Sequence, residues 1–171
     1  MLLAVSFVLS YLESLVPLPF FTFGVRLGLG NIITMFVLFF FGFKISFLFS
    51  LSKSIFVLIT RGFMGGILSL FGGISSILVM FLLIHFLREK VSVFSVSILG
   101  AILHNLAQLL VVSLLYKSSG MFFLLPFMLG GGLLAGAVTA TLYSVFKPYL
   151  SSVYNNFNSK HLKIYNESKG K

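Results

Sequence analysis

The sequence has no cysteine and no aspartate, and only 9% of its 171 residues are charged. The absence of cysteine excludes disulfide bonds, thiolate metal sites and cysteine catalysis. The absence of aspartate excludes the aspartate-rich motifs that hold magnesium and diphosphate, and also a Ser-His-Asp triad. The acidic residues are Glu13, Glu89 and Glu167, which offer no paired carboxylates. We therefore expect no catalytic residues and no enzyme activity in this chain.

Other functional classes are disfavoured by missing motifs. No P-loop occurs, so the chain cannot hydrolyse ATP by that route. The histidines, His85, His104 and His161, lack the spacing of metal ligands, so we expect no metal and no cofactor, with haem ligation by His104 as the weaker alternative. Despite the net charge of +9, no basic cluster is interleaved with exposed aromatics. We expect no nucleic-acid partner.

What the sequence does contain is mostly apolar. Hydrophobic residues make up 58% of the chain, phenylalanine alone occurs 22 times, and the mean hydropathy is +1.12. A soluble domain would instead carry about a quarter charged residues. This composition predicts an integral membrane protein in contact with lipid.

Charged residues, glycines and prolines divide the apolar sequence into six spans. The breaks include Gly42 and the pair Arg61-Gly62. The expected spans are residues 2–16, 27–42, 44–62, 65–86, 93–116 and 121–146. The first two are shorter than the roughly 20 residues that a perpendicular crossing needs. The predicted fold class is an all-α, polytopic membrane bundle of six transmembrane helices.

The basic residues predict the orientation of this bundle. With six spans and a cytoplasmic N-terminus, Arg26, Arg61 and Lys117 fall outside and Lys53 lies within the membrane. The cytoplasmic side then receives Lys44, Arg88, Lys90, Lys147, Lys160, Lys163, Lys169 and Lys171. This asymmetry follows the positive-inside rule and places both termini in the cytoplasm. We expect a transmembrane domain over residues 1–147 and a flexible, polar, basic cytoplasmic tail over residues 148–171.

Three strongly polar side chains interrupt the fifth span. On a helix, His104 and Gln108 are i, i+4 neighbours and Asn105 lies about 100° round from His104, so all three share one arc. Polar groups at membrane depth are costly and are retained where they have partners. Two interpretations stay open: an interhelical hydrogen-bond network, or a surface that binds a ligand.

Lys53 lies too deep in the third span for its ammonium to reach either surface easily. It should form an ion pair or line a wet cavity. Glu13 is the only acidic residue within the spans, so an ion pair with Lys53, Arg26 or Arg61 is one interpretation. The other keeps a cation for an anionic or carbonyl-bearing ligand. The predicted substrate-binding residues are Glu13, Arg26, Asn31, Lys53, His104, Asn105 and Gln108, which should converge on one outward-facing pocket.

The predicted first loop, residues 17–31, overlaps the start of the second span and combines aromatic residues, prolines and glycines. It is either an interfacial connector with an aromatic belt or a lid that closes over the pocket. As a lid it would exclude water with its apolar side chains. The candidate lid residues are Pro19, Phe21, Phe23 and Gly24.

Small residues at three- and four-residue spacing mark three helix faces. They are Ser6, Ser10 and Ser14; Gly65, Ser69, Gly72, Gly73 and Ser76; and Gly132, Gly136 and Ala140. Small residues let helix backbones approach closely in lipid. For the two later faces, packing within the bundle is the favoured interpretation over docking of a partner. For the first helix the two interpretations are balanced.

Four short segments combine into a recognisable pattern. They are Ser10-Tyr11-Leu12-Glu13-Ser14, Gly24-Val25-Arg26-Leu27-Gly28-Leu29-Gly30-Asn31-Ile32, Ser69-Leu70-Phe71-Gly72-Gly73 and His104-Asn105-x-x-Gln108. Over about residues 3–146 the combination resembles the Gx transporter family, whose members are often labelled heptaprenyl diphosphate synthase component I. That family in turn resembles the substrate-binding S components of energy-coupling factor (ECF) vitamin transporters.

The resemblance implies an importer subunit for a small vitamin-like or cofactor-like molecule in a bacterial cytoplasmic membrane. It implies a site near the outer face under the first loop, and docking on a transmembrane coupling protein with ATPase subunits. S components dock through Ala-x-x-x-Ala on the first helix; Ala4-x-x-x-Val8 departs from this motif and Ser6-x-x-x-Ser10 resembles it, so the candidate docking residues are Ala4, Ser6 and Ser10. The alternatives are an accessory membrane subunit in polyprenyl diphosphate or quinone synthesis, or in a flavin or quinone redox complex.

Overall fold

The described part of the chain is almost entirely helical. The computed structural model describes residues 2–15, 29–87 and 91–169, with side chains outside the description at 13–15, 29, 119, 150 and 153–169. Its elements are α1 (Leu2–Leu15), α2 (Leu29–Leu87), α3 (Val93–Tyr116), the short 3₁₀ helix η3 (Ser119–Leu124) and α4 (Leu125–Lys169). The all-α class is therefore confirmed for the described residues, whereas the count of six helices is not, since four α-helices are distinguished there.

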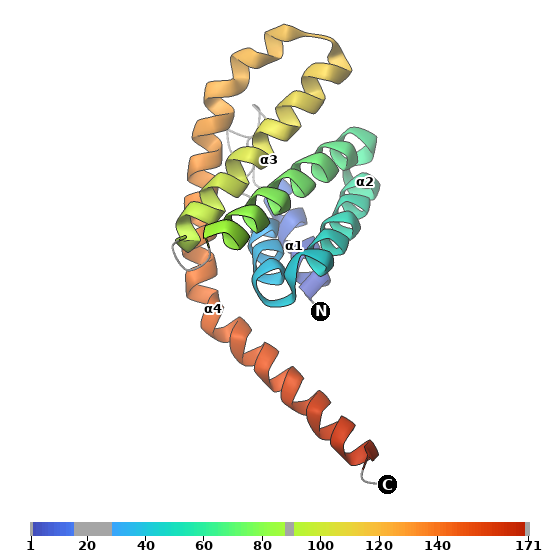
Figure 1. Ribbon diagram of the computed structural model, residues 1–171. Coiled ribbons are helices and arrows are strands. Elements are labelled where there is room, and N and C mark those ends of the chain that lie inside the picture. The colour runs from blue at the N-terminus through green and yellow to red at the C-terminus, as the bar shows by residue number, and fades with distance from the viewer. Residues whose placement is uncertain (1, 16–28, 88–90, 170–171) are drawn as a thin grey trace.

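The difference in helix count comes from two glycines within α2. Gly42 (φ 80°, ψ −178°) and Gly62 (φ 78°, ψ −178°) have non-helical backbone, and the chain turns sharply at both (Figure 1). A positive φ is accessible to glycine without the steric cost that a Cβ imposes. These glycines lie at the boundaries that the sequence predicted between the second, third and fourth spans. They divide α2 into three straight parts, residues 29–41, 43–61 and 63–87.

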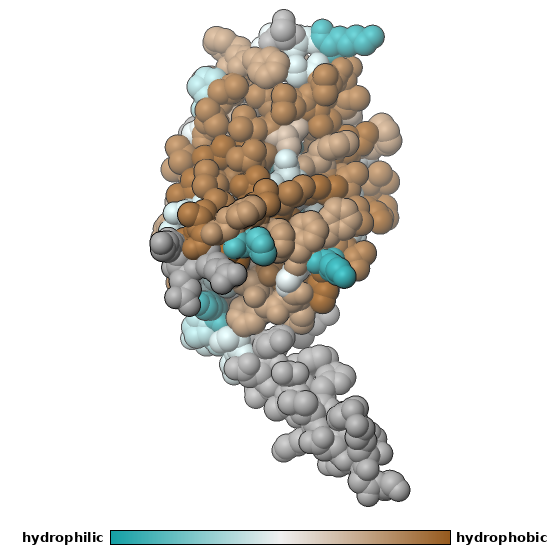
Figure 2. Space-filling view, viewed as in Figure 1, coloured by the Kyte–Doolittle hydropathy of each residue, from teal (hydrophilic) through white to brown (hydrophobic). Residues whose placement is uncertain are grey.

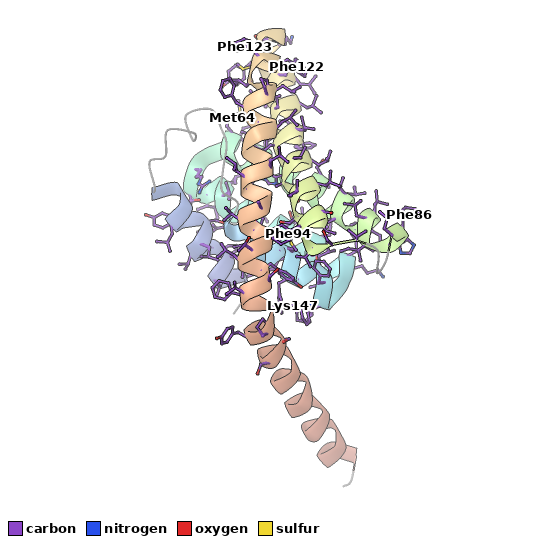
Figure 3. All side chains as sticks on the ribbon, turned by 90° about the vertical axis from the view of Figure 1, so that its left-hand side faces the viewer. Met64, Phe86, Phe94, Phe122, Phe123 and Lys147 are labelled. Atoms are coloured by element: carbon purple, nitrogen blue, oxygen red, sulfur yellow. The ribbon has the colours of Figure 1, made fainter. Side chains whose placement is uncertain are left out.

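The surface of the molecule is that of a membrane protein. Three helical stretches are long and apolar enough to cross a membrane: Gly30–Leu87, Val93–Tyr116 and Gly120–Tyr149. Their large side chains are widely exposed, for example Leu114 (76%) and Phe123 (80%), and apolar residues cover the visible face (Figure 2). Phe86 and Phe123 point away from the bundle (Figure 3). Because water would penalise such a surface, it fits a lipid environment.

The interior holds small and polar side chains beside the apolar core. α3 packs against α2 and α4, and α1 packs against α2. Phe36, Ile77, Val96 and Tyr143 join α2, α3 and α4 in one apolar cluster. Serines are buried as well; the buried serines of α2 are Ser46, Ser50, Ser54, Ser69 and Ser76. Two of these hydroxyl groups donate to the carbonyl one turn earlier, Ser46 to Gly42 (2.8 Å) and Ser54 to Ser50 (2.9 Å).

α3 and α4 approach each other closely at glycines. A Cβ placed on Gly136 would lie 2.5 Å from the Cα of Ile98, and one on Gly132 would lie 3.0 Å from the Cα of Ile102. The Ser97 hydroxyl donates to the Gly136 carbonyl (2.8 Å) across the same contact. The small face of the sixth predicted span therefore packs within the bundle, which is the interpretation that the sequence favoured.

The ends of the helices carry specific signals. Ser92 caps α3 by accepting a hydrogen bond from the Ser95 backbone amide (3.1 Å), and Lys117 ends it in the left-handed conformation. α4 continues through Pro148 as far as Lys169 and extends beyond the bundle (Figure 1). The described part of the segment expected as a tail is thus helical as far as Lys169, and its flexibility stays a prediction.

The described turns lie at two opposite ends of the bundle. The start of α1, the turn at Gly42 and α4 near Lys147 lie at one end, whereas the turn at Gly62 and the connection after α3 lie at the other (Figures 1 and 3). Lys44 and Lys147 therefore belong to the first end. The cytoplasmic location of that end stays a prediction.

Candidate functional site

A polar cavity of about 50 Å³ lies among the helices, and all four α-helices contribute to its wall. Apolar residues such as Met35, Val57 and Met80 form part of the lining. The charged and polar lining residues are Ser10 from α1; Asn31, Lys53, Arg61, Ser69 and Ser76 from α2; Ser97, His104 and Asn105 from α3; and Thr139 from α4. In a bundle whose outer surface is apolar, this concentration of polar groups makes the cavity the candidate binding site.

Two cations line the cavity, both from the middle part of α2. The Lys53 ammonium donates to the Asn31 side-chain oxygen at 2.7 Å. The Arg61 guanidinium donates to the backbone carbonyl of Ser10 in α1. Both hydrogen bonds cross between helical segments, so each cation connects the wall of the cavity to a neighbouring segment. Lys53 is half-buried, consistent with the expectation that its ammonium lies in a wet interior cavity.

Gly72 creates the space for His104. A Cβ on Gly72 would lie 2.8 Å from Cε1, 2.9 Å from Nε2 and 3.0 Å from Nδ1 of the imidazole. The ring therefore lies directly over the backbone of the last part of α2. Its Nε2 contacts the Gln108 amide nitrogen at 3.0 Å, and its Nδ1 is buried. Absence of a side chain at position 72 thus determines where the histidine sits in the cavity wall.

Asn105 and Gln108 connect α3 to its neighbours. The Asn105 amide donates to the Met128 carbonyl of α4 at 3.1 Å, and Asn105 is 4% exposed. The Gln108 amide lies 3.4 Å from the Leu68 carbonyl of α2. Asn105 also lines the cavity, whereas Gln108, which contacts His104, does not. Asn105 and Gln108 thus make interhelical hydrogen bonds, and His104 and Asn105 border the cavity; binding of a ligand by this arc stays a prediction.

Replacing Asn105 with leucine should test this division. We expect Asn105→Leu to lower the free energy of unfolding by about 0.6 to 1 kcal/mol, the value typical of one interhelical hydrogen bond in a membrane protein. Thermal unfolding in detergent measures the loss. Leu106→Ala removes apolar volume from the same turn without a polar contact and controls for altered packing. Unchanged stability in Asn105→Leu would contradict the bond's contribution.

The structure brings together much of the set that the sequence proposed. Asn31, Lys53, His104 and Asn105 surround one cavity. Arg61 lines it as well; the sequence placed Arg61 near the same outward-facing pocket but did not count it among the binding residues. Arg26 and the candidate lid residues Pro19, Phe21, Phe23 and Gly24 lie outside the described residues. Glu13 belongs to α1, and its side chain lies outside the description, so its ion pair stays a prediction.

Sequence reasoning missed the hydroxyl groups of the site. Ser69, Ser76, Ser97 and Thr139 line the cavity, and each is almost fully buried. Ser69 and Ser76 stood out only as small residues for packing. Their helical spacing within an apolar run was the available signal. A hydroxyl that faces lipid finds no hydrogen-bond partner there, so such residues are expected to face the interior. Among the described residues, no three His, Asp or Glu side chains lie close enough to hold a metal ion.

The candidate docking residues of α1 differ in their exposure to solvent or lipid. Ser6 (0% exposed) donates to the Gly30 carbonyl at 3.3 Å, and Ser10 (6%) lines the cavity. Ala4 is exposed. The serines therefore serve packing and the cavity in this structure, and docking of a partner on α1 stays a prediction.

With this geometry established, the chain can be compared with known families. Residues 2–146 match the family described as heptaprenyl diphosphate synthase component I, and they include every residue that lines the cavity. The chain belongs to this family. The match extends over all the predicted membrane spans, and it agrees with the resemblance found in the sequence segments around Glu13, Asn31, Gly72 and His104. No curated protein and no solved structure matches this member of the heptaprenyl diphosphate synthase component I family.

Proposed function

We propose that this protein is the membrane-embedded, substrate-binding subunit of an energy-coupling-factor-type importer for a small vitamin-like or cofactor-like molecule. The observation that supports the proposal is the polar cavity, which collects Lys53, Arg61 and His104 inside an apolar bundle. Charged side chains at membrane depth are expensive and commonly mark a substrate pathway. Each cation also bonds to a neighbouring segment, and the presence of both around one cavity favours a binding role beside the structural one.

A six-pass arrangement accompanies this proposal. The three parts of α2, separated at Gly42 and Gly62, would cross the membrane individually together with α1, α3 and α4. Both termini would then lie on the cytoplasmic side, in agreement with the excess of basic residues there. The cavity would sit between these crossings, and the part of the predicted first loop that precedes α2 would close over it as a lid.

The energy for transport would come from another subunit. The chain carries no P-loop, and its proposed partner is a transmembrane coupling protein with ATPase subunits. In this scheme the subunit itself performs no chemistry. Asn31, Lys53 and His104 hold the ligand, assisted by Arg26 from the lid, and Glu13 balances part of the charge.

The family description favours a second candidate, an accessory membrane subunit in polyprenyl diphosphate synthesis. In that role the chain would hold a soluble synthase at the membrane. The synthase would supply the aspartates and magnesium that prenyl transfer uses, since this chain contains no aspartate. Either candidate gives the protein a binding role and no catalytic residue.

Purification in a mild detergent distinguishes the candidates. We expect native mass spectrometry to reveal a small molecule retained by the protein, and ATPase subunits to co-elute with it from its own membranes. Retention should decrease in His104→Ala and persist in Ser52→Ala, a hydroxyl deletion in α2 outside the cavity lining. Co-elution with a prenyl synthase and no retained ligand would overturn the importer proposal. A flavin, quinone or haem in the absorption spectrum would indicate the redox complex instead.

A further inference from the structure

We infer that the molecule bound in the cavity carries an anionic group, a carboxylate or a phosphate, which lies between Lys53 and Arg61. The inference rests on the proposed binding function and names the class of its ligand. It follows from the charge balance of the cavity, from the chemistry of its lining and from its size.

The charge balance leaves the cavity positive. Lys53 and Arg61 both line it, and the guanidinium remains protonated in proteins. Glu89 follows the end of α2 and Glu167 lies close to the end of α4, so Glu13 is the only acidic residue within the apolar spans. One carboxylate can compensate one of the two cations and no more. The two half-buried cations leave an excess positive charge in the cavity wall, which a bound anion would balance.

The lining is also rich in hydrogen-bond donors. The ammonium of Lys53 and the guanidinium of Arg61 are donors only. The oxygen of Asn31 already accepts from Lys53, which leaves the amide nitrogen of Asn31 as its further donor. Hydroxyl groups such as that of Ser69 add donors to the same wall. A ligand group with several acceptor oxygens satisfies this set, as carboxylates and phosphates do.

The volume limits what the cavity can enclose in this state. At about 50 Å³ it has room for a few water molecules, each of which needs roughly 10–15 Å³. Pockets that enclose a complete drug-sized ligand occupy about 300–1,000 Å³. The cavity therefore fits one charged group of a ligand. The remainder of the molecule would require the wall to open further.

The test uses anions as probes and removes one cation at a time. Detergent-purified wild-type protein is heated with sodium phosphate, sodium acetate or sodium chloride at equal ionic strength, and the unfolding temperature is followed. We expect phosphate or acetate to raise it above the chloride value. Stabilisation by phosphate would indicate a ligand with a phosphate group, and stabilisation by acetate would indicate one with a carboxylate.

Three variants make the result specific. Lys53→Met keeps the aliphatic stem and removes the charge, and we expect it to weaken anion binding about tenfold or more, as loss of a charge-assisted hydrogen bond does. Lys53→Arg should restore binding and shows that the fold tolerates substitution here. Lys44→Met removes an exposed cation from the same helix and should bind like the wild type.

The outcomes separate this inference from the proposed function. Anion-dependent stabilisation that is lost in Lys53→Met and kept in Lys44→Met supports the inference. Equal stabilisation of all variants, or no stabilisation beyond that of chloride, overturns it. Native mass spectrometry that finds a neutral retained molecule overturns the anionic class and leaves the binding function intact.

Discussion

Replacing Gly136 with alanine should destabilise the bundle by about 1–3 kcal/mol, the usual cost of overpacking a close contact. The added methyl group would lie 2.5 Å from the Cα and 3.0 Å from the backbone nitrogen of Ile98. Backbone atoms cannot rotate away as a side chain can, so α3 and α4 must separate. That separation also lengthens the bond from the Ser97 hydroxyl to the Gly136 carbonyl.

Two other glycines of α4 provide the controls. Gly130 has nothing within 4 Å of an added Cβ, so Gly130→Ala should be neutral or stabilise the helix by up to about 1 kcal/mol. Gly132→Ala, at 3.0 Å from the Cα of Ile102, should fall between them. Thermal unfolding in one detergent measures all three. Equal stability of Gly136→Ala and Gly130→Ala would contradict close packing of α3 on α4.

The second large effect is expected at Gly72, where alanine should displace the His104 ring. Its methyl group would meet three ring atoms at 2.8 to 3.0 Å, and the imidazole must tilt to avoid it. The contact between Nε2 and the Gln108 amide should then be lost. We expect a retained ligand to bind about tenfold more weakly, the effect of losing one good hydrogen bond to the site. Stability should change less, because alanine also favours the helix.

The neighbouring glycine provides a matched control for this substitution. In Gly73→Ala the methyl group meets the hydroxyl of Ser50, which can rotate away. Nitrogen NMR of histidine-labelled protein reports the ring directly, and native mass spectrometry reports the retained ligand. A changed His104 signal in Gly72→Ala and an unchanged one in Gly73→Ala are expected. An unaltered His104 signal in both variants would refute the placement of the ring over Gly72.

Much of the architecture was predictable from local features of the sequence. An apolar composition with sparse charge requires lipid, because each long apolar helix would otherwise expose its surface to water. Gly42 and Gly62 were predictable as boundaries, since glycine tolerates the positive φ that a sharp break uses. The sequence predicted three separate spans over this region. In the structure they form the three parts of α2 (Leu29–Leu87), which are joined directly at the two glycines.

The candidate site was predictable in its residues and not in its internal arrangement. Burial cost alone singled out Lys53 and His104, because neither fits an apolar span without a polar environment. The sequence also predicted that Asn31 converges with them on one outward-facing pocket. It gave no means of finding the 2.7 Å contact between Asn31 and Lys53, which joins residues 22 positions apart. The buried hydroxyls of α3 and α4 entered the site only through the packing of the helices.

The sequence by itself determined that this is an α-helical membrane protein. It also determined where the helical spans are interrupted and which polar side chains cannot face lipid. Those conclusions depend on residue type and on periodicity along one segment. Only the tertiary structure decided that His104 borders the cavity while its neighbour Asn105 also binds α4, and that Gln108 contacts His104 without lining the cavity. Residues on one helical arc have different roles because each role depends on the groups of the adjacent helix that the side chain contacts. A glycine at position 72 admits the ring, and a carbonyl at Met128 accepts the amide.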